Sequence, residues 1–294
     1  MRLPLLLVLL VAFLFMGCPG EDGSEGPAGP DGENWPGPVP AEYTAADGIA
    51  GGAAYSKWWS ADAGGVGTQP TTTAGKDFYR CKACHAWDGL GNAGSYASRT
   101  GQSTLNDGRP DVSSVNLRAA AEAESYQELY DLVAHAGSRD IDAADNRHPD
   151  FAAQLTSDQI WNIVKFMVEE WIAPSDLYDL AVEGSSMYVD YTVDPPVVVA
   201  PTLTYTNIGA AGDAGAGDTI YADNCASCHG ADGTTIDLGG RSVGQFAREK
   251  PNELWFKAKF GEDGYMDAGI VTDTGDMQDM YAALVNVTNY PDLP

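Results

Sequence analysis

Two copies of the pattern Cys-x-x-Cys-His occur in this chain, the first at residues 81–85 and the second at residues 225–229. The pattern is typical of covalent attachment of haem c, because each thiol adds to one haem vinyl group and the adjacent histidine binds the iron. We therefore expect two covalently attached haem c groups. The residues expected to hold them are the thiols of Cys81, Cys84, Cys225 and Cys228 and the proximal iron ligands His85 and His229.

The similarity between the two copies extends beyond the motif. Ala74, Gly75 and Tyr79 precede the first copy, as Ala216, Gly217 and Tyr221 precede the second. Asp88 follows Cys81 at the same distance as Asp232 follows Cys225. Cys225 lies 144 residues after Cys81, and Asp232 lies 144 residues after Asp88. A repeat on this scale predicts two haem domains in tandem, which is also the natural number for 294 residues.

A redox-active dithiol or half of a zinc site is the alternative interpretation of each cysteine pair. A zinc site would need two more cysteine or histidine ligands near each pair. The chain contains only four histidines, which favours haem at both positions.

The formal net charge of −26 predicts the class of partner. Such a chain should repel nucleic acid and anionic membrane surfaces, and should prefer metal cations or proteins with basic docking surfaces. We therefore expect redox proteins with basic surfaces as partners, and no nucleic acid.

The N-terminus has the pattern of an export signal. Met1 and Arg2 precede a continuous apolar run over residues 3–16, which ends at Gly17 and Cys18. This end resembles the lipobox of bacterial lipoproteins, which implies that Cys18 is lipidated and becomes the mature N-terminus. The alternative is ordinary signal cleavage that leaves Cys18 unmodified. Lipidation would anchor the protein in the periplasm, in the outer membrane or at the cell surface, and would leave none of the five cysteines for a disulfide.

Glycine recurs at every third position from Gly20 to Gly32. The run is collagen-like but short, and we expect an extended, acidic, disordered tether that continues to about Ala54. The paired Trp58 and Trp59 that follow are expected to pack into the first domain, either in its core or at a haem edge.

In the first domain, residues 75–84 are expected to form the helix that carries the haem motif. Ser125 and Glu128 form a capping-box signature, which predicts a helix that ends before Gly137. Thr156 and Gln159 form a second signature. It predicts a terminal helix whose core face is Ile160, Ile163, Val164, Met167, Val168 and Trp171.

This order of helices resembles a class I cytochrome c domain. In that family the sixth iron ligand is usually a methionine shortly before the terminal helix, and the resemblance places His148 there. We therefore expect His148 as the distal ligand of the first iron. His135 is the alternative, and Met167 belongs to the apolar stripe of the core.

The second domain repeats this order in a shorter form. Residues 216–228 are expected to form the haem helix and residues 252–260 a short helix, and a stripe from Met277 to Val285 marks the terminal helix. The resemblance places Met266 as the distal ligand, with Met277 as the alternative. Between the domains, residues 187–193 and 203–205 are rich in β-formers and predict short strands.

We thus expect a mainly α fold with two tandem cytochrome c-like haem domains, a short β-containing connector and a disordered N-terminal tether. The expected division is a signal peptide (1–17), a tether (18–54), a first haem domain (55–175), a connector (176–211) and a second haem domain (212–294).

The resemblance implies electron transfer, in a periplasmic or cell-surface respiratory chain. One alternative is a dihaem enzyme similar to the bacterial dihaem peroxidases. An enzyme needs an open iron, and ligation by both His148 and Met266 would leave none, so we expect an electron carrier. A second alternative, suggested by the glycine run, is a subunit of an extracellular cytochrome assembly.

Overall fold

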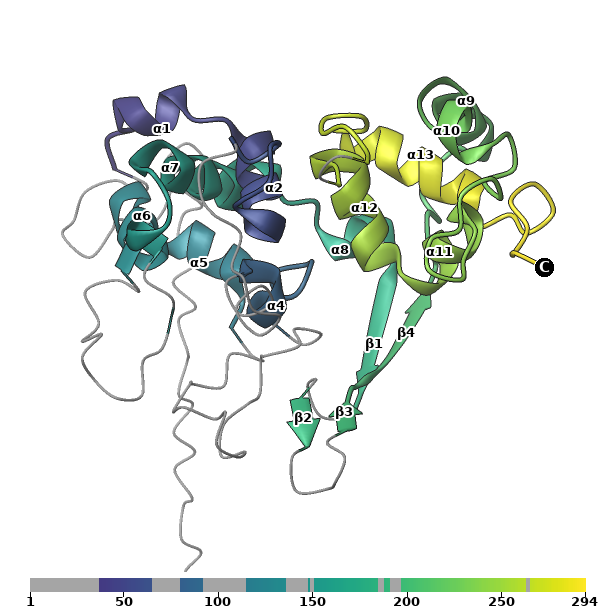
Figure 1. Ribbon diagram of the computed structural model, residues 1–294, viewed down its shortest axis with the longest axis horizontal. Helices are drawn as coiled ribbons and strands as arrows, with labels where there is room; N and C mark the ends of the chain where they lie inside the picture. Colours follow the sequence, from purple (N-terminus) through teal and green to yellow (C-terminus); the bar gives the residue numbers. More distant parts are fainter. Residues whose placement is uncertain are drawn as a thin grey trace, which may run out of the picture.

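The computed structural model is mainly helical, as the sequence predicts (Figure 1). It describes residues 37–64, 80–91, 115–135, 148, 151–184, 188–190, 197–262 and 265–294. The predicted signal peptide, Cys18 and most of the predicted tether lie outside the described residues. In the described part of the chain, none of the helices is both long and apolar enough to span a bilayer.

The first domain is built from short helices around one apolar core. They are α1 (Ala41–Ala45), α2 (Gly48–Lys57), α4 (Cys81–His85), α5 (Leu117–Ala123), α6 (Tyr126–His135), the 3-10 helix η1 (Phe151–Ala153), α7 (Ser157–Lys165) and the π-helix η2 (Phe166–Glu170). The side chain of Thr156 accepts from the backbone N–H of Gln159, and the side chain of Gln159 accepts from that of Thr156, so the predicted capping box is present. Ser125 and Glu128 make the equivalent bonds before α6.

Two of these helices correct the predicted tether. Residues 41–54 were expected to be extended, but they form α1 and most of α2, and Ala54 is buried. The predicted boundary between residues 54 and 55 therefore falls inside α2. The reason is close packing: a Cβ atom at Gly51 would lie 1.9 Å from the carbonyl oxygen of Asn162. The small residues that suggested a tether let α2 cross α7 at short range.

The second domain has the predicted helices, except that the predicted haem helix is divided at Cys225 into α9 and α10, and it has α11 in addition. They are α9 (Ala214–Asn224), α10 (Ala226–His229), α11 (Val243–Glu249), α12 (Pro251–Phe260) and α13 (Thr274–Leu284). Gly261 ends α12 in a left-handed conformation, with φ of +78°. A Cβ atom at Gly217 would lie 1.9 Å from the carbonyl oxygen of Asp279, so α9 crosses α13 as α2 crosses α7.

Of the helix predicted for residues 75–84, the described part is helical from Cys81 onward but not at Arg80. Arg80 is extended, with φ of −114° and ψ of 121°, and α4 begins only at Cys81. In the second domain, by contrast, α9 runs directly into the motif at Cys225. In its packing α9 corresponds to α2, since each helix is crossed closely at a glycine, by α13 and α7 respectively.

The connector contains four short strands after helix α8 (Pro174–Leu177). Strand β1 (Asp179–Glu183) pairs antiparallel with β4 (Thr202–Thr206), and β2 (Tyr188–Asp190) pairs with β3 (Val197–Val199). The two strands that the sequence predicts are thus present as β2 and β4. The paired strands β1 and β4 extend away from the helices (Figure 1). Helix α8, which precedes β1, contacts α13 of the second domain.

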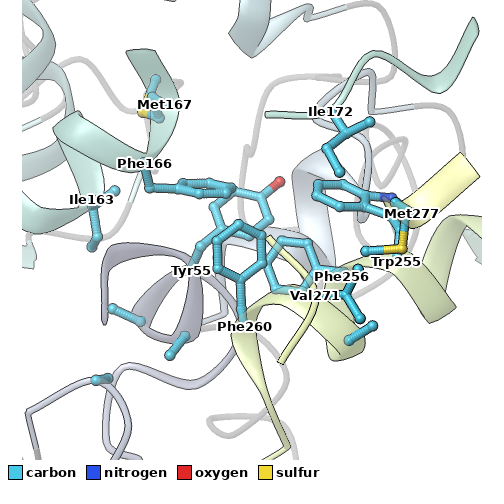
Figure 2. Close-up of a cluster of buried hydrophobic side chains, with 14 of the residues drawn as sticks. Tyr55, Ile163, Phe166, Met167, Ile172, Trp255, Phe256, Phe260, Val271 and Met277 are labelled. Carbon is cyan, nitrogen blue, oxygen red and sulfur yellow. The ribbon is translucent and has the colours of Figure 1, made fainter. Parts of the chain in front are cut away.

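The two domains share a continuous aromatic core. Figure 2 shows the rings of Phe256 and Phe260 from α12 beside Tyr55 of α2 and Phe166 of η2. The ring centroids of Phe166 and Phe260 are 5.1 Å apart, and those of Tyr55 and Phe256 are 5.8 Å apart. Because all four side chains are at most 1% exposed, the domains are packed together over a hydrophobic seam.

Candidate functional site

The two attachment segments end in the same way. Each forms a single helical turn that ends one residue after the histidine, at Ala86 with φ of 63° and at Gly230 with φ of 81°. The N–H of Ala86 donates to the carbonyl of Lys82, and the N–H of Gly230 donates to that of Ala226, both at 2.9 Å. The turn brings both thiols and the imidazole of one motif onto one short segment, as attachment to a single macrocycle requires.

The loop behind each histidine is also the same. The carbonyl of His85 accepts from the N–H of Gly91, and that of His229 accepts from the N–H of Thr235, both at 3.0 Å. These partners are 144 residues apart, as the motifs are. The repeat predicted from the motifs is therefore a structural repeat that continues beyond them.

A buried tyrosine fixes each turn from the neighbouring helix. The hydroxyl of Tyr55 donates to the carbonyl of Ala86 at 2.7 Å, and that of Tyr221 donates to the carbonyl of Gly230 at 2.9 Å. The sequence comparison matched Tyr221 with Tyr79, which lies outside the described residues. In the structure its counterpart is Tyr55.

A longer pattern could have identified this counterpart. This pattern consists of an N-cap aspartate, a glycine four residues later and a tyrosine four residues after the glycine. It occurs as Asp47, Gly51 and Tyr55, and again as Asp213, Gly217 and Tyr221. The two aspartates cap their helices, the glycines admit the crossing helix, and the tyrosines hold the haem turn. The pattern was hidden because 22 extra residues separate Tyr55 from Cys81.

Among the described residues, the four cysteines of the motifs form no disulfide. Burial, with a smaller effect of the neighbouring Cys84, raises the pKa of Cys81 to about 12. Burial likewise raises the pKa of Cys225 to about 11, with a smaller effect of Cys228. No positively charged group lowers the pKa of either thiol, as would be expected at a reactive thiolate, so these surroundings do not favour dithiol chemistry.

Buried polar atoms without a protein partner mark the space beside each motif. They include Nδ1 of His85, Nδ1 of His229 and the indole Nε1 of Trp171 and Trp255. A Cβ atom at Gly89 would lie 2.9 Å from the ring of Trp171, so this indole lies on the first attachment loop. Since buried donors are normally paired, the indole N–H of Trp171 is available to a polar group of a cofactor held at this loop.

The predicted distal ligand of the first iron lies near the proximal one. The pKa of His85 is lowered to about 3, chiefly by burial and further by the positive charge of His148. His148 packs edge-on against Phe151, with ring centroids 5.5 Å apart. The alternative, His135, is exposed at the end of α6. His148 is thus near enough to lower the pKa of His85 further, whereas His135 lies at the surface.

In the second domain, Met266 lies in the loop after α12 and is partly buried. Its backbone N–H donates to the carbonyl of Glu262, and its carbonyl accepts from the N–H of Glu262, both at 2.9 Å. The alternative, Met277, has no exposed surface and packs beside Trp255 in the seam (Figure 2). Met167 is 5% exposed and belongs to the core, as expected. Burial lowers the pKa of His229.

Comparison with known proteins identifies one family. The model of the family described as cytochrome c matches residues 72–171 and 214–282. The two segments contain the two motifs, His148 and Met266. Neither the curated proteins nor the solved structures include a match to this chain.

Proposed function

Because this chain belongs to the cytochrome c family, we propose that it is a dihaem electron carrier that is exported and anchored by a lipid. Domains of this family hold haem c covalently and transfer electrons. The observation that carries the count of two is the second attachment turn, which reproduces the first in its hydrogen bonds and in the tyrosine that holds it.

Each motif supplies the covalent and proximal contacts of one haem. In this proposal Cys81 and Cys84 attach the first group and His85 binds its iron, while Cys225 and Cys228 attach the second and His229 binds its iron. When bound, the group supplies an iron that accepts and releases one electron. The protein residues hold it, exclude water from one side and set its potential through the ligands and the burial.

We assign His148 and Met266 as the distal ligands. The proximity of His148 to His85 supports the first assignment. The position of Met266, in a hydrogen-bonded loop directly after α12, supports the second. With both positions filled, neither iron is open to substrate, which favours a carrier over an enzyme.

The charge pattern supports a basic redox partner at the second haem. Residues 166–240 contain no lysine or arginine. In the second attachment loop, Asp232 is exposed and Ile236 is 39% exposed. The first loop is covered by the second domain, since Trp87 packs on Phe256. A partner with a basic surface would therefore reach the second haem more directly.

Haem counting tests the proposal. The mass of the intact purified protein should exceed that of the processed and lipidated chain by two haem groups. Replacing Cys81 and Cys84 with serine should remove one of them, and the same change at Cys225 and Cys228 should remove the other. A wild-type protein that carries one haem or none would overturn the dihaem carrier. An iron that binds carbon monoxide or cyanide readily in the native protein would instead favour the enzyme.

The location has its own test. Lipidation at Cys18 predicts a membrane-bound protein that is released by Cys18→Ala. Wild-type protein that is soluble and starts at another residue would contradict the lipid anchor.

A further inference from the structure

The loop that carries Met266 is connected to the first domain by an ion pair. The ammonium group of Lys57, at the end of α2, lies 2.5 Å from a carboxylate oxygen of Glu262. Both side chains are largely shielded from solvent, with exposures of 25% and 26%. Lys257 of α12 approaches the other oxygen of Glu262 at 3.3 Å. Burial alone would raise the pKa of Glu262, but Lys57 and Lys257 outweigh it and keep the group ionised.

Glu262 in turn holds Met266 through the backbone. The two residues exchange a pair of hydrogen bonds, N–H to carbonyl in each direction, and form an isolated antiparallel bridge. The far end of the loop is tied to the same helix, since the N–H of Gly269 donates to the carbonyl of Lys259 at 2.8 Å. A displacement of Glu262 would therefore be passed directly to the backbone of Met266.

A second cross-domain contact supports the base of this loop. The ammonium group of Lys259, only 6% exposed, lies 3.0 Å from a carboxylate oxygen of Glu170 in η2. Between the two ion pairs, the ring of Phe260 fills the space left by Gly52, where a Cβ atom would lie 2.2 Å from the ring. The start of the loop is thus held by α2 and η2 of the first domain, on a seam visible in Figure 1 between α2 and α12.

We propose that Lys57 of the first domain is a positioning residue for the distal ligand of the second haem, acting through Glu262 on Met266. This rests on the proposed function, in which Met266 binds the second iron. Lys57 itself touches neither the iron nor the ligand. The consequence is that each domain is needed for the iron site of the other: the second covers the first attachment loop, and the first holds the ligand loop of the second.

Competition with free imidazole measures how firmly Met266 is held. In the full-length haem-loaded protein, Lys57→Met should let imidazole displace Met266 from the second iron at lower concentration. The expected drop in the apparent dissociation constant is about three- to tenfold, the effect of losing one partner of a partly buried ion pair. The first haem, with two histidine ligands, serves as the internal reference.

Matched variants separate this effect from general loosening. Lys250→Met removes a charge from the pair Lys250–Glu253 within the second domain, at 3.5 Å, and should leave the imidazole affinity unchanged. Glu262→Gln should reproduce Lys57→Met, and the double variant should show no further gain in affinity. Lys57→Arg should stay near wild type. Equal imidazole affinities in wild type, Lys57→Met and Glu262→Gln would overturn the positioning role.

A separate variant tests the assignment on which this depends. Met266→Ala should convert the second haem to a spectrum without methionine ligation and raise its imidazole affinity above that of Lys57→Met. An unchanged spectrum would overturn Met266 as the ligand, and with it the role of Lys57. A changed spectrum in Met266→Ala together with wild-type behaviour of Lys57→Met would overturn the positioning role alone.

Discussion

The hydroxyl of Tyr55 donates a hydrogen bond to the backbone carbonyl of Ala86, the residue that follows the proximal histidine of the first haem turn. Tyr55 is 1% exposed, so water cannot replace this bond without local unfolding. Tyr221 makes the same bond to Gly230. Each attachment turn is therefore held by the helix that packs behind it, although in the first domain the helix and the turn are far apart in sequence.

Removing this hydroxyl should destabilise the protein. Tyr55→Phe leaves the carbonyl of Ala86 buried without its donor, which is expected to lower the free energy of unfolding by about 1–3 kcal/mol. Chemical denaturation of the haem-loaded protein measures the change. Tyr130→Phe is the control, since its bond to Ser157 is solvent-exposed and its loss should change stability by less than about 0.5 kcal/mol. Equal effects of the two changes would contradict the role of Tyr55.

The helix crossings should not tolerate a methyl group. Gly51→Ala and Gly217→Ala would each place a Cβ atom 1.9 Å from a backbone carbonyl oxygen of the crossing helix. Alanine favours helices over glycine by about 1 kcal/mol, but the overlap should reverse this and destabilise each domain by about 1–3 kcal/mol.

Gly215→Ala provides the comparison for these crossings. In the same helix as Gly217, its Cβ atom would meet only the carboxylate oxygen of Asp213, at 3.2 Å. Thermal unfolding should therefore show a lower midpoint for Gly217→Ala than for Gly215→Ala. A midpoint for Gly217→Ala at or above that of wild type would show that the helices do not cross this closely.

The elements that the sequence predicted correctly are those with local signals. The capping box of Thr156 and Gln159 and the glycine after α12 each act within one helical turn, and both ends appear where expected. The strands β2 and β4 followed from their β-branched and aromatic residues. The haem turns followed from the motif itself, since its chemistry needs three groups on one short segment.

What the sequence hid depends on contacts across the chain. Helix α2 was interpreted as tether because its glycines and alanines resemble a linker, whereas their small size serves the crossing with α7. The sequence comparison paired Tyr221 with Tyr79, which lies outside the described residues, whereas the tyrosine that makes the equivalent hydrogen bond is Tyr55. The ion pair between Lys57 and Glu262 joins residues 205 apart, and no local pattern indicates it.

Acid should weaken the contact between the domains. The pKa of Glu262 lies below its ordinary value of 4.5 in the folded protein. At a pH between the folded pKa of Glu262 and its ordinary pKa, the unfolded chain binds more protons than the folded protein. The free energy of unfolding therefore rises with pH in that range. The contribution of Glu262 is thus complete above pH 4.5 and is lost as the pH falls through the folded pKa. The stability difference between wild type and Glu262→Gln, measured from neutral to acid pH, should shrink below that range. A constant difference would contradict the ion pair.

Association with a basic redox partner should depend on salt. With a net charge of −26, the chain should attract such a partner over long range. Because charges more than about 10 Å apart are screened at 0.1 M salt, the bimolecular electron-transfer rate should fall as ionic strength rises. A rate that does not change with salt would contradict electrostatic docking.

The two irons should differ in reduction potential, because their proposed distal ligands differ. Imidazole donates electron density more strongly and favours the oxidised iron, whereas the thioether of methionine favours the reduced iron and raises the potential. The first haem, with His85 and His148, should therefore titrate below the second, with His229 and Met266. A redox titration followed by visible and magnetic spectroscopy would resolve the two steps.

Substitution at each distal position assigns these steps to residues. His148→Met should raise the lower potential and leave the upper one nearly unchanged, while Met266→His should lower the upper one. Electrons would then rest on the second haem and occupy the first only in passing. If His148→Ala still shows two histidine ligands on the first iron, then His135 or another group is the distal ligand, and the proximity of His148 to His85 has a structural cause instead.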